Sequence, residues 1–204
     1  MKKTCGVYSA LLLLAVVISG CNVSEASEKS TVVKLSQNED RKQAFTDLNV
    51  VSVLDFDLTW RDADETELFI WAEQYKDGRL DPEQIISLST YSEETKENGN
   101  IGMGIADVNS ETPMVVLYAP GSAMRSELEN KLDYTNAAYG WEAAIGEESL
   151  KVEEGKTYLL GVYRVSDGLS IASYDLQNEG EVERMIKDDR TGFLLKMKVE
   201  KKEE

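Results

Sequence analysis

The fold of this chain is decided by residues 50–60, which read VVSVLDFDLTW. Within this stretch the large apolar side chains of Leu54 and Phe56 alternate with the carboxylates of Asp55 and Asp57. A period of two is that of a β-strand with one buried face, because successive side chains point to opposite sides of a sheet. The stretch therefore predicts a strand that buries its apolar residues and turns both aspartates toward solvent.

The same alternation continues along most of the chain and ends at Phe193, Leu195 and Met197. Further strands are predicted over residues 67–75, 84–91, 101–108, 113–118, 139–144, 149–152, 157–165 and 193–199. Residues 62–65 are expected to form a hairpin turn, and residues 139–144 and 149–152 a second hairpin. Short helices are expected over residues 123–132 and 179–186. These elements predict an all-β fold, a mainly antiparallel sandwich with one or two short helices.

A short stretch, Glu153 to Tyr158, places a turn and a tyrosine before an apolar strand. It resembles the entry to a late strand of immunoglobulin-like domains, which implies an immunoglobulin-like sandwich.

Composition excludes several kinds of chemistry. Among 204 residues there are no histidines and two cysteines. Without histidine there is no Ser-His-Asp triad, no Cys-His pair and no histidine-liganded zinc. The catalytic groups that remain are carboxylates, hydroxyls, lysines and carboxylate-bound metals.

The N-terminus has the three parts of an export signal. Lys2 and Lys3 precede an apolar stretch from Val7 to Ile18, which is too short to span a membrane as a helix. The stretch ends in Ile18-Ser19-Gly20-Cys21, which resembles the lipobox of bacterial lipoprotein signal peptides. That resemblance implies a diacylglyceryl group on the Cys21 thiol and cleavage before Cys21.

This signal predicts how the chain is organised and where it is located. Residues 1–20 are the signal peptide, residues 21–47 a disordered polar tether, residues 48–199 one sandwich domain and residues 200–204 a charged tail. The mature protein is expected on the outer face of the cell membrane in a one-membrane bacterium. In a two-membrane bacterium it is expected on the outer membrane.

The net charge of the protein limits the kinds of partner that we expect. Cleavage removes Lys2 and Lys3 and no acidic residue, so the formal charge changes from −16 to −18. Such a charge repels phosphate backbones and disfavours nucleic acid as a partner. The expected partners are the membrane, through the lipid anchor, and a protein or another envelope component. No cofactor is expected beyond the covalent lipid on Cys21.

The opening stretch also supports a catalytic alternative. An apolar strand followed by Asp55-x-Asp57-x-Thr59 resembles motif I of the haloacid dehalogenase-like phosphatases. The resemblance implies a parallel α/β fold, Asp55 as nucleophile, Asp57 as general acid/base, and Mg²⁺ held by both. Against it, the alternation continues through Thr59 and Trp60, as in the exposed face of an ordinary sandwich strand.

Two binding alternatives remain. Asp62, Asp64 and Glu65 are hard oxygen ligands of the kind that Ca²⁺ prefers, although they do not match an EF-hand loop. The aromatic residues could form a stacking platform for sugars; these are Trp60, Trp71, Trp141, Tyr134 and Tyr139. The sequence therefore favours a lipid-anchored, non-catalytic binding module, with a phosphatase and a calcium- or carbohydrate-binding module as alternatives.

Overall fold

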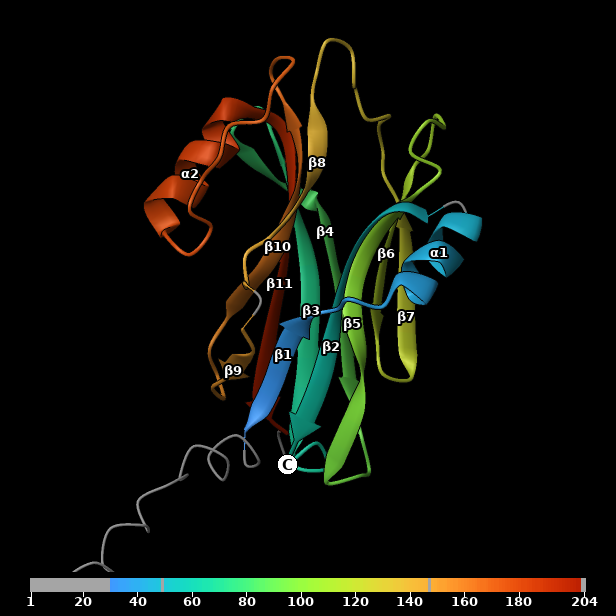
Figure 1. Cartoon of the computed structure of the whole chain (residues 1–204), viewed down its shortest axis with the longest axis vertical. Helices are drawn as coiled ribbons and strands as arrows, with labels where there is room; N and C mark the ends of the chain where they lie inside the picture. The colour runs from blue at the N-terminus through green and yellow to red at the C-terminus, as the bar shows by residue number, and fades with distance from the viewer. Residues whose placement is uncertain (1–29, 49, 147, 203–204) are drawn as a thin grey trace, which may run out of the picture.

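The computed structural model describes residues 30–48, 50–146 and 148–202. Within these residues the strands form two antiparallel sheets, which pack face to face as a sandwich (Figure 1). The predicted fold class, an all-β sandwich with two short helices, is confirmed. The predicted signal peptide and Cys21 lie outside the described residues.

Sheet A has six strands in the order β7-β6-β5-β2-β1-β9 within the described part of the chain. Their bounds are β1 (Thr31–Leu35), β2 (Val50–Arg61), β5 (Lys96–Ala106), β6 (Met114–Ala119), β7 (Ser122–Glu127) and β9 (Leu150–Val152). Sheet B has five described strands in the order β4-β3-β11-β10-β8. These are β3 (Thr66–Lys76), β4 (Arg79–Tyr91), β8 (Tyr139–Ala143), β10 (Tyr158–Ser166) and β11 (Asp189–Lys201).

The core between the sheets is built from the inward residues of the long strands. In β2, Leu54, Phe56 and Trp60 are buried, as the alternation predicts. Facing residues of sheet B, such as Leu68 and Phe193, complete one continuous apolar cluster. Burial of apolar surface on both inner faces is therefore what holds the two sheets together.

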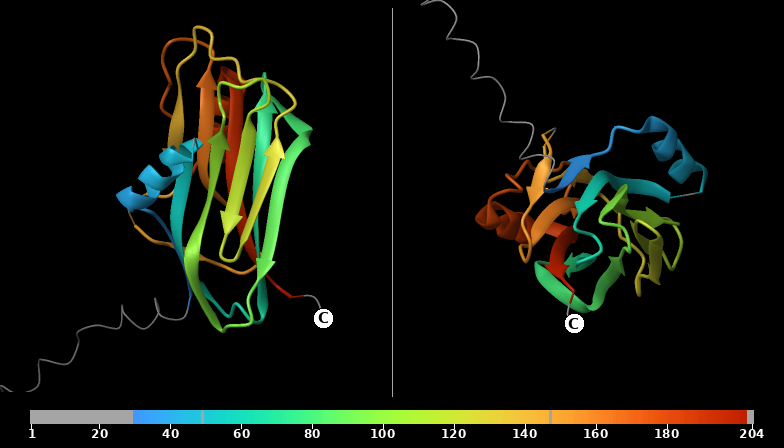
Figure 2. Two further views of the ribbon diagram at one scale, coloured as in Figure 1. Left: turned by 90° about the vertical axis from the view of Figure 1, so that its right-hand side faces the viewer. Right: turned by 90° about the horizontal axis from the view of Figure 1, so that it is seen from below.

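Two helices lie on opposite outer faces of the sandwich, α1 (Glu39–Asp47) against sheet A and α2 (Glu179–Asp188) against sheet B (Figures 1 and 2). Asn38 and Asn178 cap them, each with a side-chain oxygen that accepts a backbone N–H of the first turn. The prediction of a helix over residues 179–186 is confirmed.

The predicted tether is wrong for residues 31–47, because β1 and α1 lie within this range. β1 pairs with both β2 and β9, so its backbone groups are hydrogen-bonded within sheet A. Val33 is also fully buried in the core. One apolar side chain and two neighbouring strands are enough to order a segment whose composition is polar.

Three local predictions are also corrected. Residues 123–132 do not form a helix, because Pro120 and Gly121 join β6 to β7 as a hairpin with Ala119 opposite Ser122. Residues 62–65 are not a hairpin turn but cross from sheet A to sheet B, since β2 and β3 pack face to face. Likewise β8 and β9 belong to different sheets and do not pair with each other.

The turn before β10 is held by the tyrosine of the Glu153–Tyr158 stretch. The Tyr158 hydroxyl accepts a hydrogen bond from the Glu153 backbone N–H at 3.0 Å. This bond ties the start of β10 to the loop that precedes it.

Candidate functional site

The two aspartates of the opening stretch lie in the middle of β2 on the outer face of sheet A, beneath α1. Asp55 is not exposed to solvent as predicted but is 4% exposed. Arg41 of α1 places Nη1 at 3.3 Å from Asp55 Oδ1 and 3.2 Å from Oδ2, and the Tyr118 hydroxyl donates to Oδ1 at 2.9 Å. Asp55 is thus enclosed by one cation and one hydroxyl.

Asp57 belongs to the same network. Asn100 Nδ2 donates to Asp57 Oδ1 at 2.9 Å, and Arg41 Nη2 lies 3.5 Å from the same atom. Lys34 Nζ lies 3.6 Å from Asp57 Oδ2. Each aspartate therefore has its charge balanced by groups that the sequence alone did not connect to it, because Arg41 was assigned to the tether.

Gly102 makes room for this network. A Cβ atom at Gly102 would lie 2.3 Å from the Tyr118 hydroxyl oxygen and 2.2 Å from the Leu54 carbonyl oxygen. Only glycine lets Tyr118 cross the strand to Asp55. Burial, and then the nearby Asp55 carboxylate, raise the pKa of Tyr118, so its hydroxyl stays a proton donor.

These contacts hold α1 on the sheet and do not resemble a phosphatase centre. That chemistry was inferred from a family with a parallel α/β fold, whereas every pairing among the described strands is antiparallel. Asp55 also lies mid-strand, where α1 covers it. The geometry therefore gives no support to Asp55 as a nucleophile.

The acidic turn proposed for calcium connects β2 to β3. Asp62 and Glu65 are exposed, and the Lys202 ammonium donates to the Asp64 carbonyl oxygen at 2.6 Å. Among the residues that the structure describes, no three acidic, histidine or cysteine side chains converge to hold a metal ion.

The aromatic residues proposed as one sugar platform lie in three places. Trp60 is buried in the core, where its Nε1–H donates to Thr66 Oγ1 at 2.8 Å. Trp141 packs in the sandwich against Tyr163, with ring centroids 4.8 Å apart. Tyr134 and Tyr139 lie beside this pair, with ring centroids 4.7 Å apart, and the Tyr163 hydroxyl donates to the Tyr134 hydroxyl at 2.9 Å. Trp71 alone of the five lies on the outer face of sheet B.

That outer face is a second candidate site. Along β3, inward residues such as Leu68 and Ile70 are buried, while Glu67, Phe69 and Trp71 are partly exposed. α2 covers only the part of this face near Val162 and Leu194. The remainder, the open face, consists of Glu67, Phe69, Trp71, Ser87, Ser89, Tyr91, Lys196, Lys198 and Glu200, brought side by side by the strand register.

Glu73 fixes the upper border of the open face. Its carboxylate accepts hydrogen bonds from Trp71 Nε1 at 2.9 Å, the Tyr75 hydroxyl at 2.8 Å and Lys196 Nζ at 2.8 Å. Burial alone would raise the pKa of Glu73, but the bonds from Lys196, Trp71 and Tyr75 lower it overall. Burial, and then the hydrogen bond to the Glu73 carboxylate and its charge, raise the pKa of Tyr75 to about 12. Glu73 therefore stays ionised and orients the Trp71 indole.

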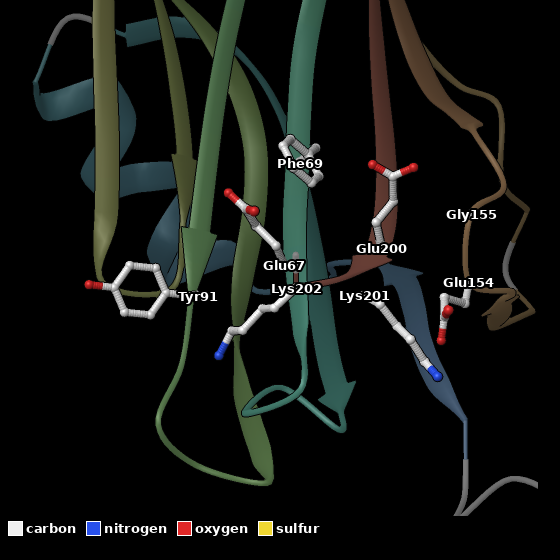
Figure 3. Close-up of a pocket in the computed structure, with 8 residues that line it drawn as sticks. All are labelled: Glu67, Phe69, Tyr91, Glu154, Gly155, Glu200, Lys201 and Lys202. Carbon is white, nitrogen blue, oxygen red and sulfur yellow. The ribbon is translucent and has the colours of Figure 1, made fainter. Parts of the chain in front are cut away.

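A pocket of about 810 Å³ lies at the lower end of the open face (Figure 3). The residues that line it combine aromatic rings with charged groups: Glu67, Phe69, Tyr91, Glu154, Gly155, Glu200, Lys201 and Lys202. The Lys202 ammonium lies 5.5 Å from the centroid of the Tyr91 ring and donates to the Ser92 carbonyl oxygen at 3.1 Å. The pocket is thus bordered by fixed hydrogen-bonding groups as well as rings.

A second cavity, of about 680 Å³, lies where the open face meets α2. Its lining includes Tyr75, Leu159 and Lys196 from sheet B and Val182 and Ile186 from α2. Lys196 belongs to both the open face and this cavity. Hollowed surface therefore lies at each end of the open face.

Sequence reasoning could have located part of this face. Residues 68–71 are apolar on both sides of the strand, so at least one large side chain there had to lie outside the core. The partners of that side chain on β4 and β11 depend on long-range register, which the local pattern does not contain.

Comparisons with protein-family models, curated proteins and solved structures each found no match for this chain. Within the described residues, no helix is long and apolar enough to cross a membrane.

Proposed function

We propose that this protein is an exported, lipid-anchored and non-catalytic module that binds a polysaccharide of the cell envelope through the open face of sheet B. The proposal rests on three aromatic side chains, the partly exposed Phe69 and Trp71 and the exposed Tyr91, on a sheet face that α2 leaves uncovered. Large exposed apolar groups gathered on one face mark a binding surface.

The chemistry of the face favours a sugar polymer. Sugar rings have apolar C–H faces that stack on aromatic side chains, and hydroxyl groups that hydrogen-bond to carboxylates, ammonium groups and serine hydroxyls. The open face presents both kinds of group within one strand register, for example Ser89 opposite Phe69 and Lys196 opposite Trp71. Its strand-long extent fits several linked sugars better than a single one.

The proposed anchor supports an envelope ligand. Eight residues lie between the proposed lipid site at Cys21 and Ser30, where the described chain begins, so nine residue steps of at most ~3.3–3.6 Å limit the distance to about 30 Å. β1 starts at the end of the sandwich where β11 finishes, which is also the end that carries the 810 Å³ pocket (Figures 1 and 3). An anchor at Cys21 would hold the pocket close to the membrane-proximal layer of the envelope.

Binding is tested by co-sedimentation of the domain, residues 22–204, with purified peptidoglycan sacculi and with chitin. We expect the domain to bind at least one of them, and Trp71→Ala and Tyr91→Ala each to weaken binding about tenfold, or ~1.4 kcal/mol. The matched control is Tyr139→Ala, which removes a tyrosine that is 58% exposed outside the open face. Absence of binding to both polymers, or equal losses in all three variants, contradicts the proposal.

The anchor is tested separately by metabolic labelling with a fatty-acid analogue. The unaltered precursor is expected to take up label, and Cys21→Ala to abolish it. Cys5→Ala is the matched control, because Cys5 lies within the predicted signal peptide. Labelling that persists in Cys21→Ala contradicts the lipid-anchor assignment.

A further inference from the structure

A separate pocket of about 320 Å³ lies at the opposite end of the sandwich from the open-face pocket. The two ends are joined by β3, along which Glu67 and Asp77 are about 33 Å apart at ~3.3 Å per residue. The lining comes from the β3–β4 turn, from residues 129–133 and from the start of β11. Except for Leu132, the side chains that line it are polar or charged.

An irregularity in sheet B lies beside this pocket. Glu73 pairs with Ile85 and Tyr75 pairs with Leu80, so residues 81–84 of β4 bulge out opposite Gln74. Pro82 lies in this bulge and has no backbone N–H to donate. The bulge leaves Gln74 without a partner residue in β4.

Gln74 lines the pocket, and its side-chain carbonyl oxygen is a buried hydrogen-bond acceptor. The residue is 8% exposed, and its Oε1 atom has no hydrogen-bond partner among the described residues. A buried carbonyl oxygen without a donor costs about 1–3 kcal/mol. A ligand with N–H groups would supply the donor that the protein lacks at this point.

The charges around Gln74 favour a cation. Asp77, Asp81 and Glu129 line the pocket, and no lysine or arginine of the described chain forms an ion pair with them. Two cations in the lining are already engaged. Lys131 pairs with Glu111 at 3.0 Å, and Arg190 pairs with Asp133 at 2.9 Å and with Asp167 at 3.2 Å.

Lys76 is the remaining cation of the lining. It is exposed at the end of β3 and its strand partner is Arg79. Even with Lys76 counted, the pocket holds more uncompensated negative than positive charge.

We infer that this pocket binds an organic ammonium ligand, a small amine or diamine, with an ammonium N–H donated to Gln74 Oε1 and its charge balanced by Asp77, Asp81 and Glu129. The volume accommodates a short carbon chain with an ammonium group. The large negative charge of the domain raises the local concentration of such cations. The site uses no residue of the open face, so it stands apart from the proposed function.

The test is isothermal titration of the domain with putrescine, with butanediol as the uncharged compound of the same length. We expect saturable binding of putrescine and none of butanediol. Asp77→Asn combined with Asp81→Asn should weaken putrescine about tenfold, because two ion pairs of up to ~1 kcal/mol each are lost.

The matched control is Asp62→Asn. Asp62 and Asp77 are both exposed turn residues with positive φ, 51° and 50°, a conformation that asparagine tolerates. Asp62 lies at the other end of β3, so its loss changes the net charge without touching the pocket. Equal weakening by Asp62→Asn would identify non-specific attraction and overturn the inference.

A second readout needs no substitution. In a ¹H–¹⁵N spectrum, the side-chain amide of Gln74 should shift as putrescine binds and stop shifting at saturation. The inference is overturned if putrescine does not bind at millimolar concentration, if butanediol binds equally, or if the Gln74 amide stays unmoved while binding proceeds.

Discussion

The two helices are attached to opposite faces of one sandwich by opposite means (Figure 1). α2 buries Met185 in an apolar cluster with Val162 and Leu194 of sheet B. α1 has no buried residue and is attached to sheet A by the ion pair of Arg41 with Asp55 and by the Phe45 ring, 5.4 Å from that of Tyr118.

This difference in attachment indicates which helix is part of the folded core. Apolar burial is non-directional and is not screened by salt, so α2 should stay in place as long as sheet B is folded. The attachment of α1 depends on a few directed contacts around a guanidinium that is 25% exposed and therefore screened by salt. We expect α1 to detach locally while the sandwich remains folded.

The largest effect is expected beneath α2, at the buried pair of Arg164 and Asp189. Arg164 Nε donates to Asp189 Oδ2 at 2.6 Å, and the two side chains are 1% and 5% exposed. Asp189→Asn leaves the buried guanidinium with only the partly exposed Glu142 carboxylate, 3.4 Å from Nη1, as its counter-charge. The change should lower the free energy of unfolding by up to about 3–5 kcal/mol in urea titrations.

Its neighbour Asp188 is the matched control. Asp188 is exposed and accepts a hydrogen bond from the Tyr174 hydroxyl, which an asparagine oxygen can also accept. Asp188→Asn should change stability by under about 0.5 kcal/mol. Similar losses in the two variants would show that burial of the pair is not what matters.

The next prediction compares the loss of stability when one apolar side chain is removed from each helix. Met185→Ala should cost about 2–5 kcal/mol of unfolding free energy, since Met185 is 1% exposed. Phe45→Ala should cost about 0.5–1.5 kcal/mol, the worth of a partly exposed aromatic pair. If Phe45→Ala costs as much as Met185→Ala, α1 is part of the core and the comparison fails.

A smaller effect is expected from the ion pair that holds α1. Arg41→Ala leaves Asp55 with the Tyr118 hydroxyl and should cost about 1–3 kcal/mol at low salt. Amide exchange in α1 should then become fast while exchange in α2 stays slow. Added salt should have the same effect on the unaltered protein. Unchanged α1 protection in both cases would contradict attachment of α1 through the ion pair.

The smallest effect is the pH dependence of stability that arises from Glu73, at the border of the open face. Because the pKa of Glu73 is lowered in the folded protein, its contribution is fully present above the ordinary carboxyl pKa of about 4.3 and is lost as pH falls through the folded value. Glu73→Gln should reduce this loss, by under about 1 kcal/mol because the network is partly exposed. Urea titrations at a series of acidic pH values measure it, and identical profiles would refute it.

The alternation around Phe56 was enough to predict the sandwich, because a two-residue period depends only on neighbouring positions. It also predicted which side of β2 is buried. The alternation could not predict that the outer face of β2 is covered at Asp55. Arg41 and Tyr118, which cover it, come from distant parts of the chain. Asp55 therefore occupies a position that the alternation assigns to the exposed face, although its side chain is buried.

The candidate site was less accessible to sequence reasoning than the fold. Trp60 and Trp71 are both strand tryptophans, and only their parity separates a core residue from a surface one. Trp60 is on the same face of β2 as the buried Phe56. Trp71 follows the buried Ile70 directly and is therefore on the other face of β3. The pocket beside Gln74 lies next to a bulge in β4, and the local pattern of residues 84–91 did not place β4 as far back as Arg79.

The central claim is that the open face of sheet B, and not the surface around α1, is where this protein binds a glycan. The most direct measurement is a ¹H–¹⁵N titration of the domain with soluble peptidoglycan or chitin fragments. We expect the Trp71 indole N–H and the amides of Phe69, Tyr91 and Lys198 to shift together, while those of Arg41 and Tyr118 stay unmoved. Shifts centred on α1, or none anywhere at saturating fragment, would contradict it.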